Sequence, residues 1–136
     1  MKKVLFVCVE NSCRSQMAEA FAKIDGKDTI ESYSAGSRAS GKVNEKAIKS
    51  MREVGYDLSS NRSKFLNDIP AVEYDFAITM GCGDECPNVR AKRRVDWAIP
   101  DPKNMNNEEF NKIRDMIREK TLELIDVLNI EGRGTQ

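Results

Sequence analysis

Residues 4–15 read VLFVCVENSCRS, and this stretch decides the fold. A short apolar run ends at Cys8, a compact polar loop follows, and Arg14-Ser15 opens a segment with helical periodicity. In a strand–loop–helix unit, the backbone N–H groups of the loop and of the first helical turn converge on one point, which suits a tetrahedral anion. We therefore predict an oxyanion-binding loop around the Cys8 thiol, made of Val9, Glu10, Asn11, Ser12, Cys13, Arg14 and Ser15.

Three side chains in this stretch suit nucleophilic chemistry. The helix dipole and a nearby guanidinium both favour the thiolate form of Cys8 over the thiol. Arg14 can fold back over the loop, where its planar fork suits two oxygens of a phosphate-like group. Ser15 can hydrogen-bond the sulfur. A simpler interpretation makes Cys8 a buried strand cysteine. The C-x5-R-S spacing at the carboxyl edge of the first strand, where open α/β sheets bind ligands, favours the functional one.

Bulk composition limits the possible classes of protein. The 136 residues suit one ordinary domain, and we expect residues 1–136 to form it. Lysine plus arginine and aspartate plus glutamate both number 22, so no global field favours nucleic acid or an anionic membrane. The longest apolar run, residues 4–9, is too short to cross a bilayer, and we expect a cytoplasmic protein. Four cysteines in such a protein favour redox, catalytic or metal-binding roles over structural disulfides.

The rest of the chain alternates between strand and helix patterns. We predict further strands at residues 29–34, 74–80 and 93–97, helices at 14–24, between Asn44 and Gly55, and at 107–128, a short helix near 64–68, and a frayed end at 131–136. This alternation predicts an α/β fold with a doubly wound, four-stranded parallel sheet. The loops after the first, third and fourth strands would open at one edge, bringing together Cys8, Cys82, Cys86 and Asp101.

A second pair of cysteines, Cys82 and Cys86, lies among glycines after the third strand. Glycines allow unusual backbone angles and motion. A mobile dithiol beside a thiolate suits a disulfide relay, because exchange proceeds by successive thiolate attacks that must each align. The alternative is half of a zinc site completed by Cys8 or Cys13. The absence of histidine and the pairing of Cys8 with Arg14 favour the relay, and we expect Cys13 to be structural.

Asp101 stands between Pro100 and Pro102, which hold its loop stiff. A carboxyl group fixed over an oxyanion can protonate a leaving oxygen as a general acid. An Asp-Pro dipeptide by itself is a common turn. Its combination with the C-x5-R-S motif makes Asp101 a candidate catalytic residue.

Together these motifs resemble a known family. Cys8-x5-Arg14-Ser15 near the N-terminus, with Asp101-Pro102 in the C-terminal third, resembles the low-molecular-weight protein tyrosine phosphatase superfamily. The additional cysteines and the run NSCRSQMAEA, residues 11–20, resemble its arsenate reductase branch. The resemblance spans nearly the whole chain. It implies a flavodoxin-like three-layer sandwich, arsenate as substrate, and phosphate or sulfate as competing anions.

The resemblance also implies a role for each residue. Cys8 attacks arsenate held by the loop amides and Arg14, while Asp101 protonates the departing oxygen. Cys82 then attacks the Cys8 sulfur and releases arsenite, and Cys86 attacks Cys82 to present a disulfide to an external dithiol reductant. Thioredoxin is the commonest reductant in the family, and some relatives use glutaredoxin or a low-molecular-weight thiol. We expect no tightly bound cofactor and no metal.

Three features of the sequence depart from the family pattern, and they bear on substrate binding, a bound cation and the reductant. Glu10 stands where relatives often have glycine, and a carboxylate so near an anion site is unfavourable unless it points to solvent. Lys64 stands where some members place an aspartate that helps hold a monovalent cation with Asn11, Glu19 and Ser34. Because an ammonium group can take that place, we predict no potassium requirement. The spacing of the later cysteine pair is tighter than in the best-known thioredoxin-coupled members, so the electron donor stays open.

Two other functions fit parts of the pattern. A tyrosine phosphatase needs the nucleophile, the arginine and the aspartate but not the second cysteine pair. Such enzymes also tend to carry tyrosines after the Asp-Pro pair, whereas residues 103–105 are Lys-Asn-Met and the next aromatic residue is Phe110. A zinc-bound regulatory or interaction module could instead use the four cysteines, and metal analysis of purified protein would identify it.

Overall fold

The four predicted strands form one parallel sheet, in the order β2-β1-β3-β4. The computed structural model describes residues 1–81 and 89–134. Its elements are β1 (Lys2–Cys8), α1 (Arg14–Asp25), β2 (Ile30–Gly36), α2 (Glu45–Arg52), the 3₁₀ turn η1 (Leu66–Asp68), β3 (Tyr74–Thr79), β4 (Ala91–Asp96) and α3 (Asn107–Gly134). The α/β fold class predicted from the sequence is confirmed.

Strand β1 lies in the interior of the sheet because both of its faces are apolar. Val4 and Phe6 belong to the larger core, which they share with residues of α1 and α3. Leu5 and Val7 point to the opposite face, as the two-residue period of a strand requires. A parallel strand covered on both faces reads as a continuous apolar run, and residues 4–7 do so.

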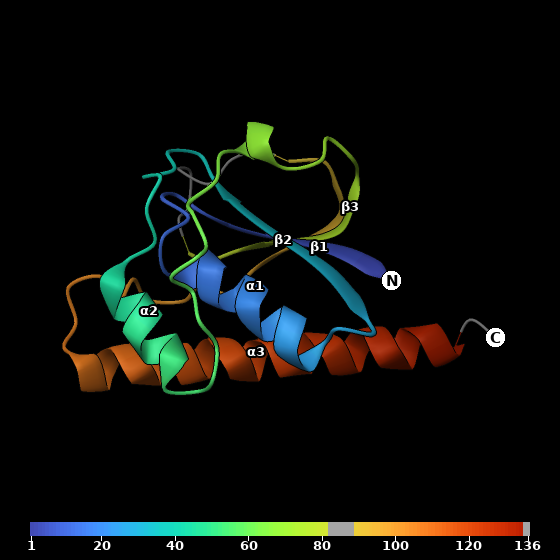
Figure 1. Ribbon diagram of the computed structural model, residues 1–136. Coiled ribbons are helices and arrows are strands. Elements are labelled where there is room, and N and C mark those ends of the chain that lie inside the picture. Colours follow the sequence, from blue (N-terminus) through green and yellow to red (C-terminus); the bar gives the residue numbers. More distant parts are fainter. Residues whose placement is uncertain (82–88, 135–136) are drawn as a thin grey trace.

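The two faces of the sheet are covered unequally. Helices α1, α2 and α3 gather on one side, and a thin layer containing η1 covers the other (Figure 1). In that thin layer, Leu66 and Ile69 pack against the small cluster around Leu5. Among the described residues, the layer on this face is therefore an irregular segment that contains the 3₁₀ turn η1, where the sequence predicted a short helix at 64–68.

A side-chain cap marks the start of α2, and a tertiary ion pair lies near the end of α3. Asn44 caps α2, its side-chain oxygen accepting a hydrogen bond from the Lys46 N–H at 2.8 Å. The predicted fraying from residue 131 is wrong for residues 131–134, because α3 continues to Gly134. A bidentate ion pair between Arg93 on β4 and Glu131, at 2.8 and 2.6 Å, ties this last part of the helix to the sheet.

Within residues 1–81 and 89–134, no helix combines the length and the apolar character that crossing a bilayer requires. Strand β1, which contains the apolar residues 4–7, pairs with strands on both sides. Its carboxyl end opens onto the loop that precedes α1.

Candidate active site

A cavity of about 670 Å³ lies at the carboxyl edge of the sheet. Cys8 lines it from the end of β1, Arg14 from the start of α1, Gly81 from the segment after β3, and Asp101 and Lys103 from the loop after β4. Three of the residues predicted to be catalytic thus share one cavity. Ligands of open α/β sheets bind at this edge, where the loops that follow parallel strands converge.

The sulfur of Cys8 receives two polar contacts from its own loop. The Asn11 backbone N–H donates to Cys8 Sγ at 3.2 Å, and Ser15 Oγ lies 2.8 Å from the same atom. Asn11 has φ of 51°, in the left-handed region that asparagine tolerates better than most residues. This turn of the backbone directs the Asn11 N–H towards the sulfur.

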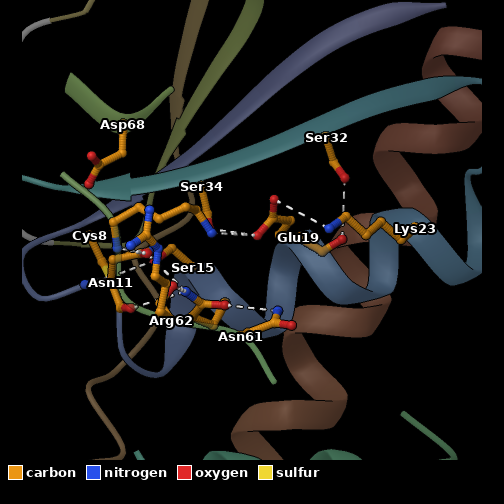
Figure 2. A network of polar contacts seen from close by, with 12 residues as sticks. Cys8, Asn11, Ser15, Glu19, Lys23, Ser32, Ser34, Asn61, Arg62 and Asp68 are labelled. Atoms are coloured by element: carbon orange, nitrogen blue, oxygen red, sulfur yellow. Dashed lines mark hydrogen bonds and ion pairs between the residues drawn. The ribbon is translucent and has the colours of Figure 1, made fainter. Parts of the chain in front are cut away.

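A backbone N–H group determines how the side-chain amide of Asn11 is oriented beneath Cys8. The Lys64 N–H donates to Asn11 Oδ1 at 2.8 Å, so the amide nitrogen of Asn11 faces the other way and donates to Ser15 Oγ at 2.7 Å. Ser15 Oγ, which accepts this bond, in turn lies 2.8 Å from Cys8 Sγ (Figure 2). The Asn11 N–H and the Ser15 hydroxyl thus place two polar groups against the Cys8 sulfur.

Gln16 holds Asn11 in place and was not among the predicted site residues. Its fully buried side chain donates from Nε2 to Asn11 Oδ1 and to the Arg62 carbonyl, both at 2.9 Å. Asn61 Nδ2 donates to Gln16 Oε1 at 3.4 Å. The sequence does contain a signal for Gln16. It is a polar residue spaced four positions from Ala20, so it falls on the face of α1 that is buried.

A buried carboxylate extends the same network along α1. Glu19 Oε1 accepts a hydrogen bond from Ser34 Oγ at 2.8 Å and lies 3.3 Å from Lys64 Nζ, while Glu19 Oε2 lies 3.7 Å from Lys23 Nζ (Figure 2). Lys64 therefore contributes twice. Its N–H orients Asn11. Its ammonium group neutralises Glu19, one of the residues expected from the family resemblance to help hold a monovalent cation. The expectation about potassium stays a prediction.

Arg14 joins the loops after β3 and β4. Its Nη1 donates to the carbonyl oxygens of Met80, at 2.5 Å, and of Ile99, at 2.7 Å. Its Nη2 lies 4.0 Å from Asp101 Oδ2. A guanidinium held by two carbonyl groups is already oriented before an anion arrives, so binding an oxyanion costs little side-chain entropy.

Asp101 lies on the open side of the cavity. Its Oδ1 accepts the Lys103 backbone N–H at 3.0 Å, which closes a tight turn after Pro100. Ala98, earlier in the loop, has φ of 51°. The carboxyl group is thus positioned by its own backbone, beside Arg14 and on the cavity wall that it shares with Cys8.

The second cysteine of the loop has a different environment. Cys13 is buried and belongs to the hydrophobic core. Burial raises the pKa of the Cys13 thiol to about 12, against an opposing hydrogen bond with Ser12. The Cys13 thiol therefore stays protonated at neutral pH and is no candidate for the attacking group.

Cys82 and Cys86 lie outside the described residues, so the structure does not place the predicted relay. The described chain reaches Gly81, which lines the cavity and whose N–H donates to Asp96 Oδ1 at 2.7 Å. Within the part of the chain that the structure describes, no three cysteine, aspartate or glutamate side chains gather as a metal-ligand set. Metal analysis of purified protein tests zinc binding through Cys82 and Cys86.

A thiol with two polar contacts beside a fixed arginine is typical of cysteine-dependent enzymes that act on tetrahedral oxyanions. The chain belongs to the low molecular weight phosphotyrosine protein phosphatase family, whose model matches residues 3–133.

Among the similar proteins is the glutaredoxin arsenate reductase of Synechocystis sp., 41% identical over 128 residues, with 92% of this chain and 97% of the relative covered. A solved structure described as an arsenate reductase in the phosphate binding state has a TM-score of 0.82 at 39% identity, covering 94% of this chain and 99% of that one. A thioredoxin-dependent arsenate reductase of Corynebacterium glutamicum has a TM-score of 0.75 at 28% identity, covering 96% of this chain and 63% of that one.

Proposed function

We propose that the protein reduces arsenate to arsenite with Cys8 as the nucleophile and Cys82 and Cys86 as the dithiol that carries the oxidation onward, as part of arsenic detoxification. The observation that carries the proposal is the Cys8 sulfur, which accepts the Asn11 N–H and lies 2.8 Å from Ser15 Oγ in a cavity that Arg14 also lines. Relatives named arsenate reductase, 37–41% identical over most of the chain, support this substrate.

The first step uses residues of the cavity. The Cys8 thiolate attacks arsenic and forms a sulfur–arsenic bond, and one oxygen leaves as water after Asp101 supplies a proton. The loop N–H groups and the Arg14 guanidinium hold the remaining oxygens and stabilise their negative charge. Arg14 is suited to this task because the Met80 and Ile99 carbonyls already orient it.

The second step moves two electrons to arsenic. The Cys82 thiolate attacks the Cys8 sulfur, a disulfide forms, and the electron pair of the sulfur–arsenic bond stays with arsenic, which leaves as arsenite. The Cys86 thiolate then attacks Cys82 and frees Cys8. The resulting Cys82–Cys86 disulfide must be reduced by an external dithiol for the next turnover.

We infer that thioredoxin is the reductant, with glutaredoxin and a low-molecular-weight thiol as the alternatives to be compared. One similar protein is named as thioredoxin-dependent and another as a glutaredoxin arsenate reductase, so relatives of this chain use both kinds of donor. The proposal requires no tightly bound cofactor. It places the protein in the cytoplasm, where thiol reductants keep the three cysteines reduced between turnovers.

Arsenate-dependent oxidation of thioredoxin tests the relay. Cys8→Ser should abolish turnover. Cys86→Ser should release about one arsenite per enzyme and then stop as a Cys8–Cys82 disulfide, whereas Cys82→Ser should release none, because only Cys82 attacks the Cys8 sulfur. Full multiple turnover by Cys82→Ser would overturn the relay. Replacing thioredoxin with glutaredoxin or glutathione in the same assay identifies the donor.

Hydrolysis of phosphate esters is the second candidate function, favoured by the family to which the chain belongs. The loop that holds arsenate has the geometry for phosphate, and water can hydrolyse a phosphocysteine at Cys8. Turnover of p-nitrophenyl phosphate by Cys82→Ser, together with no arsenate reduction by the unmodified protein, would establish the phosphatase instead. Stoichiometric zinc in purified protein would favour the zinc-bound module.

A further inference from the structure

An ion pair lies at the rim of the cavity, between two loops that are far apart in the sequence. Glu10, in the loop after β1, has its Oε1 3.1 Å from Nζ of Lys103, in the loop after β4. Both residues line the cavity, and their side chains are 43% and 51% exposed. The pair therefore joins the two sides of the cavity where it opens to solvent.

Each partner is also held by its own loop. The Lys103 backbone N–H donates to Asp101 Oδ1, and Ser12 Oγ donates to Glu10 Oε2 at 3.4 Å. Glu10 raises the pKa of Lys103, so the lysine stays charged throughout the neutral range. The rim thus carries one fixed negative and one fixed positive charge.

The position of the pair gives it a greater effect on ligands than on folding. An exposed ion pair contributes little to stability. An anion entering the cavity, however, passes beside a carboxylate that repels it and an ammonium group that attracts it, in a concave site where charges act more strongly than on an open surface. The two side chains should change anion affinity in opposite directions.

The pair also restricts the shape of the ligand. A free tetrahedral oxyanion is small enough to bind between the Cys8 loop and Arg14. An aryl phosphate bound there would place its ring in the rest of the cavity, which Glu10 and Lys103 also line. The bridged rim therefore favours a compact inorganic oxyanion over an ester.

We propose that Glu10 and Lys103 form a charged clamp that determines specificity for free tetrahedral oxyanions over phosphate esters. The inference deepens the proposed function, since it concerns the same cavity, but its central measurement requires no redox turnover. Glu10 lowers oxyanion affinity, Lys103 raises it, and their bridge excludes bulky leaving groups.

Protection of Cys8 from iodoacetamide by inorganic phosphate measures the affinity directly. Glu10→Gln should tighten phosphate binding about threefold, and Lys103→Met should weaken it about threefold, with both effects shrinking in 0.5 M salt. The exposed pair Lys3–Glu31, 3.8 Å apart with exposures of 42% and 41%, supplies matched controls at the opposite end of the sheet. Lys3→Met and Glu31→Gln should leave phosphate binding unchanged.

Truncating each of the two side chains tests whether their bridge excludes bulky leaving groups. Glu10→Ala and Lys103→Ala should each raise the ratio of kcat/KM for p-nitrophenyl phosphate to the inverse protection constant of phosphate by about fivefold or more. Shifts of phosphate affinity in the same direction for Glu10→Gln and Lys103→Met, or an unchanged ester ratio in both truncations, would overturn the clamp. Failure of arsenate reduction with normal phosphate protection would overturn the proposed function instead.

Discussion

Two glutamate–lysine pairs flank the anion-binding loop, with nearly the same separation and very different surroundings. Glu19 and Lys64 approach to 3.3 Å beneath the loop, with side chains 7% and 21% exposed. Glu10 and Lys103 approach to 3.1 Å at the rim, where both are about half exposed. Each pair links the first loop or helix to a distant segment. Distance alone would rank them as equal.

Burial determines what each pair does. A carboxylate removed from water needs its charge and its lone pairs satisfied, and breaking such a pair leaves an uncompensated buried charge. Glu19 meets this requirement through Lys64, Lys23 and Ser34. Glu10 and Lys103 are both about half exposed, so their pair adds little to folding stability and acts mainly on ligands.

The largest expected effect is on stability, and it separates the two pairs. Glu19→Ala removes the acceptor of the Ser34 hydroxyl and the counter-charge of Lys64, and should lower the free energy of unfolding by roughly 2–4 kcal/mol. Glu10→Ala should change it by less than about 0.5 kcal/mol. Urea unfolding followed by circular dichroism measures both. Equal changes in the two variants would show that burial does not distinguish the pairs.

A smaller effect tests how the buried network reaches the nucleophile. Gln16→Leu removes the donor that holds Asn11, and should slow alkylation of Cys8 at neutral pH about tenfold, because the Asn11 N–H and the Ser15 hydroxyl lose their alignment on the Cys8 sulfur. Stopped-flow alkylation with mass spectrometry of the Cys8 peptide gives this rate. The same variant should lower kcat more than it raises KM, since the substrate is held mainly by the loop amides and Arg14.

Lys64→Met is the matched control for that experiment. It removes the ammonium group beside Glu19 but keeps the backbone N–H that donates to Asn11 Oδ1. Stability should fall by about 1–2 kcal/mol, while the alkylation rate of Cys8 changes less than about twofold. A rate as slow as that of Gln16→Leu would mean that the charge of Lys64, rather than its backbone, supports the nucleophile.

Features that depend on local sequence could be predicted, whereas features that depend on side-chain contacts between distant segments could not. The unit β1–loop–α1 was predictable because its apolar run, its polar loop and its helical period are all local. The meeting of Cys8, Arg14 and Asp101 at one cavity followed from parallel topology, which brings separate loops to one edge. The role of Gln16 depends on Arg62 and Asn61, which are far away in sequence, and Lys103 contacts Glu10 across 93 positions. The pattern of residues along the chain does not indicate such contacts between distant segments.

The end of α3 was missed for the same reason. Residues 131–134 have the polar composition of a fraying terminus, and the contact between Arg93 and Glu131 that extends the helix is tertiary. The 3₁₀ turn η1 likewise depends on packing of Leu66 and Ile69 against the sheet. The placement of Cys82 and Cys86 stays a prediction from the sequence.

The smallest expected effect is the response to potassium. Lys64 Nζ already lies beside Glu19 Oε1, with Ser34 Oγ donating to the same oxygen, so a monovalent cation would have to compete with a covalently attached ammonium group. Arsenate reduction should therefore differ by less than about 20% between potassium chloride and choline chloride at equal ionic strength, because general screening is then the same. Rates at several concentrations of each salt provide the measurement. A saturable acceleration by potassium alone would show that Lys64 leaves this position in solution, and that the buried pair is as exchangeable as the pair at the rim.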